Sequence, residues 1–200
     1  MGHPPAVVRL VILATVDQLA RAQRHLAAIP GAAEQAMARA LNRAATAGRQ
    51  AAVESITERY AVNASDVRSK ITLTAARPDS LGVMITARSP SLSLTYFPHT
   101  PTRAGTGGPG RPVLRAEIRR GESKAIPGAF IATINGKPKI MIRTGGKTKA
   151  GKQAIRSATG VPIAVMLGAV SVRAAVEERA LEVLDARLGH EIDRALAGAA

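Results

Sequence analysis

The 200-residue sequence has no cysteine, no tryptophan and only four aromatic side chains. Without cysteine, disulfide bonds, thiolate metal sites and cysteine nucleophiles are excluded. Because aromatic residues are so scarce, Ala, Val, Ile and Leu must form the core, which predicts close, alanine-mediated helix packing. The histidines lie far apart and show neither His-x-x-x-His nor His-x-x-Glu-His spacing, so we expect no metal site. These histidines are His3, His25, His99 and His190.

Long hydrophobic runs are also missing. The apolar stretch 6–16 contains Arg9 and ends at Asp17, well short of the roughly 20 residues that a membrane span needs. It lacks the basic start and small-residue cleavage site of a signal peptide. We therefore expect no membrane contact and interpret residues 7–13 as a buried β-strand.

Two glycine-rich segments resemble nucleotide-binding loops only superficially. Segment 145–148 has the Gly-Lys-Thr ending of a P-loop, but Met141 and Ile142 occupy the positions where an earlier glycine is required. Segment 105–110 contains Pro109, which obstructs the helix start that a dinucleotide-binding loop needs. We therefore expect no cofactor.

Both ends of the chain show helical patterns. Thr15 and Gln18 form a Thr-x-x-Gln capping box that predicts a helix over 16–28. A second helix is predicted over 32–59 and a third over 172–196, where apolar residues recur every four positions. Such a stripe winds around the helix, which indicates more than one neighbouring element. The residues of the last stripe are Val172, Val176, Ala180, Leu184, Leu188, Ile192 and Leu196.

The middle of the chain shows the alternation typical of strands. Residues 65–68 predict a capped turn before a hairpin formed by strands 71–75 and 81–88. Alternating apolar residues predict a third strand over 91–97, limited in length by the flanking prolines.

Further strands are predicted over 113–120, 126–134 and 139–143, and the last two meet at Asn135-Gly136, a dipeptide that favours a tight hairpin turn. Segments 98–112 and 144–152 are rich in Gly, Pro, Thr or Lys and are interpreted as mobile loops. We expect the second loop to become ordered on assembly.

The net charge of +14 is concentrated in one region. Residues 102–156 contain thirteen Lys or Arg and only two acidic residues, Glu117 and Glu122, a net charge of +11. Neither glutamate has a neighbouring His or Asp with which to form an acid/base pair, so we expect no enzymatic activity. Exposed Lys and Arg suit sequence-independent phosphate contact, but an acidic protein surface would fit equally well. The candidate partner-facing residues are Arg111, Arg115, Arg119, Arg120, Lys137, Lys139, Arg143, Lys147, Lys149 and Lys152.

Four short segments in a fixed order resemble the phage minor tail protein Z family, over roughly residues 32–170 of this chain. They are Ala38-Arg39-Ala40-Leu41-Asn42-Arg43, then Arg59-Tyr60 with Asp66-Val67-Arg68, then Pro127-Gly128-Ala129-Phe130-Ile131-Ala132, then Ile155 with Gly160-Val161-Pro162. The resemblance implies a structural virion protein, a tail completion protein that completes the tail or joins it to the head at the neck. It implies a homo-oligomeric, six-fold ring in contact with other tail, neck or connector proteins. It implies no catalytic residues.

We therefore predict an α+β fold, with long helices at both ends packed around a largely antiparallel sheet or small barrel. A single domain spans 1–200, with helical ends at 6–60 and 161–197 and a basic β-rich core at 65–156. The expected location is the virion, after assembly in the host cytoplasm, with genome DNA as a further candidate partner. The alternatives are a free sequence-independent nucleic-acid-binding protein, favoured by the pI near 11.4, and an enzyme acting on polyanions.

Overall fold

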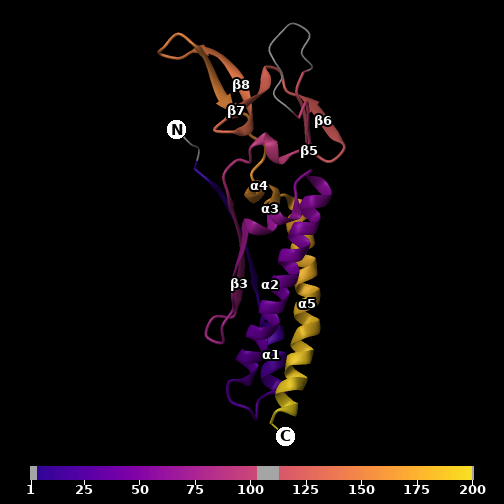
Figure 1. Ribbon diagram of the computed structural model, residues 1–200. Helices are drawn as coiled ribbons and strands as arrows, with labels where there is room; N and C mark the ends of the chain where they lie inside the picture. The colour runs from indigo at the N-terminus through magenta and orange to yellow at the C-terminus, as the bar shows by residue number, and fades with distance from the viewer. Residues whose placement is uncertain (1–3, 103–112, 200) are drawn as a thin grey trace.

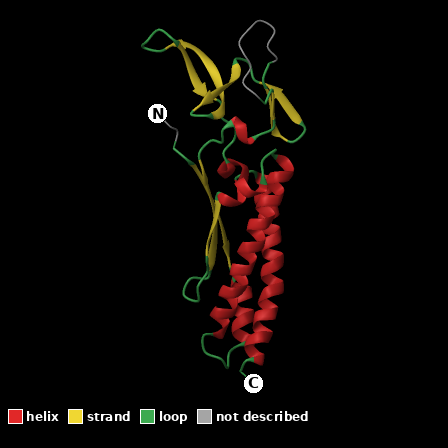
Figure 2. Ribbon diagram, viewed as in Figure 1, coloured by secondary structure: helices red, strands yellow, loops and turns green. Residues whose placement is uncertain are grey.

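The structure, a computed structural model, describes residues 4–102 and 113–199. It is elongated (Figure 1): two long helices lie side by side, a sheet packs along one side of them, and two small sheets occupy one end. Helices and strands are both abundant, so the α+β class is confirmed (Figure 2). A barrel is not confirmed, because the described strands divide among three separate three-stranded sheets.

The two long helices are α2 (Ala32–Arg59) and α5 (Val170–Ala197), close to their predicted bounds. They pack against each other rather than around a sheet, and the buried positions of α5 follow the predicted four-residue spacing from Val172 to Ile192. Small residues bring the backbones close together. A Cβ at Gly48 of α2 would lie 3.1 Å from Ile85 Cδ1 and 3.3 Å from Val176 Cγ1, so this position has room for little beyond hydrogen.

Helix α1 (Val16–His25) begins at the predicted capping box. The Thr15 hydroxyl accepts from Gln18 N at 3.2 Å, and Gln18 Oε1 accepts from Thr15 N at 3.0 Å. Gln18 Nε2 also donates to Asp185 Oδ1 at 2.7 Å, which ties α1 to α5. The helix ends three residues earlier than predicted.

The sheet beside the helices has the order β1-β3-β2 and is antiparallel throughout. It contains β1 (Ala6–Leu13), β2 (Ile71–Thr74) and β3 (Gly82–Ser89), so the predicted hairpin is confirmed and the N-terminal strand joins it. The prediction that β1 is buried is wrong for half of its residues. Leu10 and Ile12 face the helices, but Val7, Val11 and Leu13 are exposed because the helices cover only one face of the sheet.

Short helices α3 (Ala64–Ser69) and α4 (Ile163–Leu167) connect the long helices to the rest of the chain. The predicted strand over 91–97 is wrong: Leu94–Tyr96 forms a 3-10 turn, η1, whose start is capped by the Ser93 side chain. Leu94 and Phe97 are both buried there.

The two small sheets have the orders β4-β5-β6 and β7-β8-β9. Part of the predicted loop 98–112 pairs as β4, and residues 103–112 lie outside the described residues. The loop predicted over 144–152 is wrong in its first part, since β8 continues to Lys147 before the chain turns into β9. The strands are β4 (His99–Thr100), β5 (Arg115–Arg119), β6 (Glu122–Ala125), β7 (Ala129–Ile134), β8 (Lys137–Lys147) and β9 (Gln153–Ser157).

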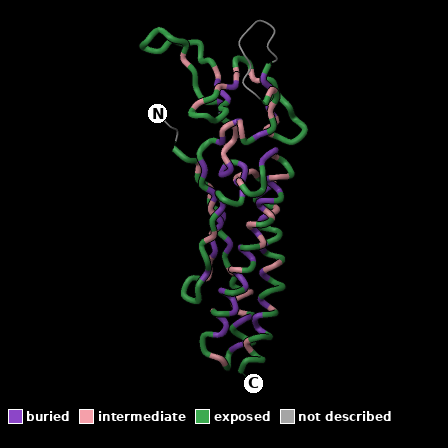
Figure 3. The backbone as a smooth tube through the Cα atoms, viewed as in Figure 1, coloured by how far each residue is buried: buried purple, intermediate pink, exposed green. Residues whose placement is uncertain are grey.

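Burial differs sharply along the molecule (Figure 3). We call α1, α2, α5 and the sheet β1-β3-β2 the shaft, and the sheets β4-β5-β6 and β7-β8-β9 the basic tip. Most of the core side chains lie in the shaft, whereas the outer ends of the tip strands are exposed.

Candidate functional site

The basic tip holds most of the excess charge of the molecule. The sequence has no Asp or Glu from Ser123 to Val176, so the cations of β8 and β9 have no carboxylate within the sheet β7-β8-β9. Among the described residues, none of the cations on these three strands forms an ion pair. A surface of this kind leaves its positive charge available to an external anion.

A tight turn positions the first lysines of the sheet β7-β8-β9. Asn135 and Gly136 have φ of 52° and 72°, the left-handed values that this hairpin turn requires, as their sequence predicted. The turn pairs Ile134 with Lys137, and strand alternation then places Lys139 and Arg143 on the same face as Lys137.

Phe130 of β7 shares this face, because it pairs with Met141, two residues from both Lys139 and Arg143. The Arg143 guanidinium carbon lies 4.4 Å from the centre of the Phe130 ring, a cation–π contact that orients the arginine. The opposite face carries Ile131 and Ile140, which are buried. Lys137, Lys139 and Arg143 therefore share one face of the sheet with the buried Met141, whereas Arg156, which pairs with Ile142, lies on the face of Ile140.

The end of the β8–β9 hairpin carries three more lysines, Lys147, Lys149 and Lys152, all exposed. Thr148 N donates to Lys152 O at 2.7 Å and Gly151 N donates to Thr148 O at 2.9 Å, so backbone hydrogen bonds close the turn. The hairpin end therefore has a defined turn, and its ordering on assembly stays a prediction.

Cations on the sheet β4-β5-β6 are partly engaged by nearby groups. Arg115 Nη2 donates to Ser123 O at 2.6 Å, while Arg119 is exposed. Lys124 Nζ lies 2.9 Å from Glu122 Oε2. The hydrogen bond from Lys124 and its positive charge hold the pKa of Glu122 below its usual range.

Arg120 has a different environment from the other candidates, at the joint between tip and shaft. Its Nε donates to Thr57 O at 2.6 Å and its backbone N donates to Arg59 O at 3.0 Å. Both acceptors belong to the last turn of α2, where carbonyl groups lack helical partners and favour a cation. Arg120 therefore attaches the tip to the shaft.

The ten sequence-predicted residues are thus divided. Arg111 lies outside the described residues, Arg115 and Arg119 lie on one small sheet, and Arg120 lies at the joint. The remaining six are spread along β8 and its hairpin turn: Lys137, Lys139 and Arg143 come first, and Lys147, Lys149 and Lys152 lie at the far end. Sequence reasoning left Phe130, Lys124 and Arg156 out of the site, although strand alternation places Phe130 beside Arg143.

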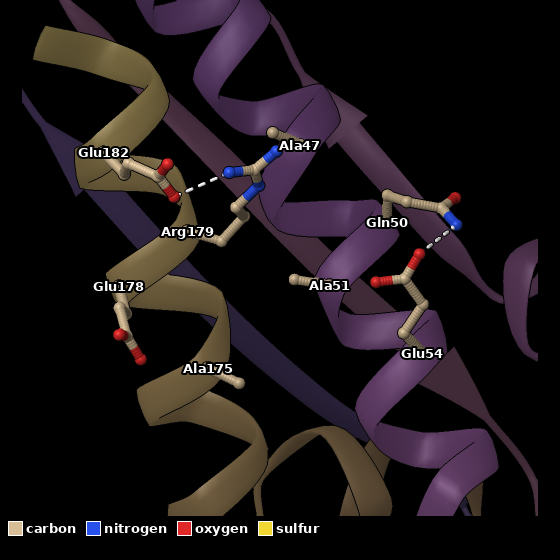
Figure 4. A pocket seen from close by; sticks show the side chains of 8 residues that line it. All are labelled: Ala47, Gln50, Ala51, Glu54, Ala175, Glu178, Arg179 and Glu182. Carbon is tan, nitrogen blue, oxygen red and sulfur yellow. Dashed lines mark hydrogen bonds and ion pairs between the residues drawn. The ribbon is translucent and has the colours of Figure 1, made fainter. Parts of the chain in front are cut away.

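The groove between the two long helices does not gather reactive groups. A groove of about 380 Å³ between α2 and α5 has a floor of Ala47, Ala51 and Ala175 and a rim of polar side chains (Figure 4). Four of these polar groups form two pairs: Gln50 Nε2 donates to Glu54 at 2.8 Å and Arg179 Nη1 lies 2.6 Å from Glu182. The rim offers no nucleophile beside a base.

Neither a metal site nor a membrane span is found in the described ranges, 4–102 and 113–199. No group of three or more His, Asp or Glu side chains there is arranged to hold a metal ion. None of the helices described combines the length and apolarity that crossing a membrane requires.

An elongated α+β molecule whose distinctive surface is a charged tip rather than a cavity is typical of a structural or assembly protein. The family model of prophage minor tail protein Z (GPZ) matches residues 16–199, and the chain belongs to this family. The match confirms the resemblance and extends it through the last helix.

Comparison with curated proteins and with solved structures gave no match. Family membership supports a structural role in a phage tail. It also implies contact with other tail proteins and a place in the virion.

Proposed function

We propose that this protein completes the phage tail and joins it to the head as a homo-oligomeric ring, with the basic tip directed toward the lumen. Six-fold symmetry follows from the family resemblance alone. In such a ring, genome DNA or acidic neighbouring proteins would face the tip.

The observation that carries this proposal is the separation of charge from core along an elongated molecule. The shaft holds most of the buried residues, and one end holds the cations of β8 and its hairpin. Parallel copies would bring their tips together into a continuous positive surface. A ring of tips around DNA needs no base reading, because Lys and Arg contact phosphates regardless of sequence.

A second candidate function is that of a free, sequence-independent nucleic-acid-binding protein. The exposed lysines Lys147, Lys149 and Lys152 favour it. A free binder would bind DNA tightly as an isolated monomer, whereas a ring component depends on several tips acting together.

Electron microscopy of particles assembled without this protein tests the first proposal. The expected result is normal heads and normal tails that remain unjoined, with infectivity restored by supplying the protein. Intact infectious particles would contradict the proposal. Tight, salt-sensitive DNA binding by the monomer, together with intact particles, would support the second function instead.

A further inference from the structure

Strand β1 is the longest edge strand among the described residues and has a free side. All eight of its residues pair with β3, from Ala6 with Ser89 to Leu13 with Gly82, without a register shift. Within residues 4–102 and 113–199, no strand pairs with its other side. Alternate backbone N–H and C=O groups along that side can therefore form hydrogen bonds with another strand.

The outward side chains of β1 are apolar where solvent-facing strands usually carry charge. Val7, Val11 and Leu13 are 44%, 56% and 62% exposed, and Arg9 is the single charge among them. Natural proteins protect long edge strands with prolines, bulges or several charges. Strand β1 has no proline and no bulge, and Arg9 is its one charged residue that opposes pairing.

The small sheets of the tip do show such protection. Edge strand β6 carries Lys124 and edge strand β9 carries Arg156, both exposed. The pairings β5–β6 and β8–β9 each contain a register shift. Edge strand β7 of the tip is also uncharged and regularly paired, but it is shorter than β1, with six residues against eight.

We propose that the β1 edge of one copy pairs with the β2 edge of the next copy, which continues the sheet from subunit to subunit. Strand β2 is the opposite edge of the same sheet, and no strand pairs with its outer side in the part of the chain that the structure describes. Both β1 and β2 are antiparallel to β3, so they run in the same direction. When a second copy is placed beside the first by translation or rotation, its β2 therefore lies parallel to the free edge of β1.

The side chains and the geometry both suit a second copy. The outward residues Thr72 and Thr74 of β2 are exposed and uncharged, so the apolar face of β1 meets no buried charge. Contact between two different edges repeats from copy to copy and closes into a ring when the rotation allows, whereas β1 paired with β1 stops at a dimer. This inference rests on the proposed self-association and names its surface.

The cysteine-free chain allows a direct test by cross-linking. The full-length Val11→Cys and Thr72→Cys variants would each be treated with a short, flexible bis-maleimide, alone and mixed. We expect covalent dimers in the mixture at a yield at least tenfold above that of either variant alone, and a ladder of multiples from the double variant. Equal dimer formation by Val11→Cys alone would overturn the arrangement, as would the absence of dimers in the mixture.

Sedimentation of the full chain over a range of concentrations gives the second test. We expect the wild type to associate. The dissociation constant of the Val11→Glu variant should be at least tenfold higher, because a charge would lie beside the strand of the next copy. Leu181→Glu, which places the same charge on an exposed leucine of α5, should associate like the wild type. Circular dichroism would check that both variants stay folded.

A wild type that stays monomeric, or a Val11→Glu variant that associates unchanged, would overturn this inference. A monomeric wild type would also count against the proposed ring, whereas tail completion itself is tested separately by particles that lack the protein. Unjoined heads and tails combined with normal association of the Val11→Glu variant would retain the function and reject this surface.

Discussion

The shaft and the basic tip are built by different means. In the shaft, helices α2 and α5 bury alanines, leucines and valines along their full length, and Gly48 lets the backbones approach closely. In the tip, strands that are mostly short are held by backbone pairing, the Asn135-Gly136 turn and a few buried residues such as Ile140. The shaft therefore carries most of the stability of the fold, and the surface of the tip remains free for contact with a partner.

The joint between the two regions combines local polar contacts with a shared core, because buried tip residues such as Leu114 and Ile140 belong to the same hydrophobic cluster as the shaft. Arg120 binds the last turn of α2 through Thr57 O, and Ala61 N donates to Ile118 O at 3.0 Å. Changes at the tip surface should therefore leave the shaft intact, while changes in the shaft core should destabilise the whole fold.

Leu188→Ala provides the strongest test of the prediction that the shaft core carries most of the stability. Leu188 is fully buried on α5, so its truncation should lower the free energy of unfolding by about 2–5 kcal/mol, because apolar burial decreases and a cavity forms. The matched change Leu181→Ala removes a leucine that is 45% exposed on the same helix, and it should cost about 0.5 kcal/mol or less. Urea unfolding measures both values, and equal losses would contradict a shaft-centred core.

The converse test removes charge from the tip by Lys147→Gln, Lys149→Gln and Lys152→Gln together. All three side chains are exposed, so the unfolding midpoint should stay unchanged. If these lysines bind phosphates, DNA affinity should fall at least about tenfold, ~1.4 kcal/mol. The slope of log K against log salt should decrease by about 0.9 for each phosphate that is no longer neutralised.

Binding of duplex DNA by the full chain, measured by fluorescence anisotropy at several salt concentrations, checks this result. Arg43→Gln, Arg173→Gln and Arg187→Gln remove the same charge from the exposed surface of the shaft and serve as the control. Equal losses of affinity in both triple variants would show that the net charge, and not the tip, determines the affinity.

The same difference explains what could be predicted from the sequence. The long helices follow from periodicity and from the Thr15–Gln18 box, since both signals are local. The Asn135-Gly136 hairpin is equally local. The alternation over 91–97 fits a strand, but this prediction is wrong because the chain forms a 3-10 turn there. The turn packs Phe97 on Gly160, where a Cβ would lie 2.6 Å from the ring.

The candidate site was predicted in part for a similar reason. Charge is visible in the sequence, and six of the predicted cations lie along β8 and its hairpin turn, with Lys137 and Lys147 at opposite ends of this 11-residue strand. The continuation of β8 to Lys147 could not be predicted from the Gly-Lys-Thr composition of 144–152. This part of β8 is a strand because it pairs with β9, and local propensity does not indicate that pairing. The role of Arg120 depends on Thr57, which is 63 residues away in the chain, so no local pattern could indicate it.

The smallest expected effect concerns Glu122, the acidic member of the tip's ion pair with Lys124. The Lys124 hydrogen bond, then its charge and that of Arg119, lower the pKa of Glu122 in the folded state. A lowered pKa means that this carboxylate favours folding above its unfolded pKa, and that the contribution disappears as the pH falls through the folded pKa.

Because Glu122 is exposed to solvent, the pair should add little to stability, and the effect should be visible in the titration alone. Lys124→Met should return the NMR titration midpoint of Glu122 toward its usual range, and Arg119→Gln should move it less. A midpoint unchanged by Lys124→Met would show that the lysine does not hold Glu122 in solution. In that case Lys124, like the lysines of β8, would be available to an external anion. The cationic surface of the tip would then extend across both small sheets.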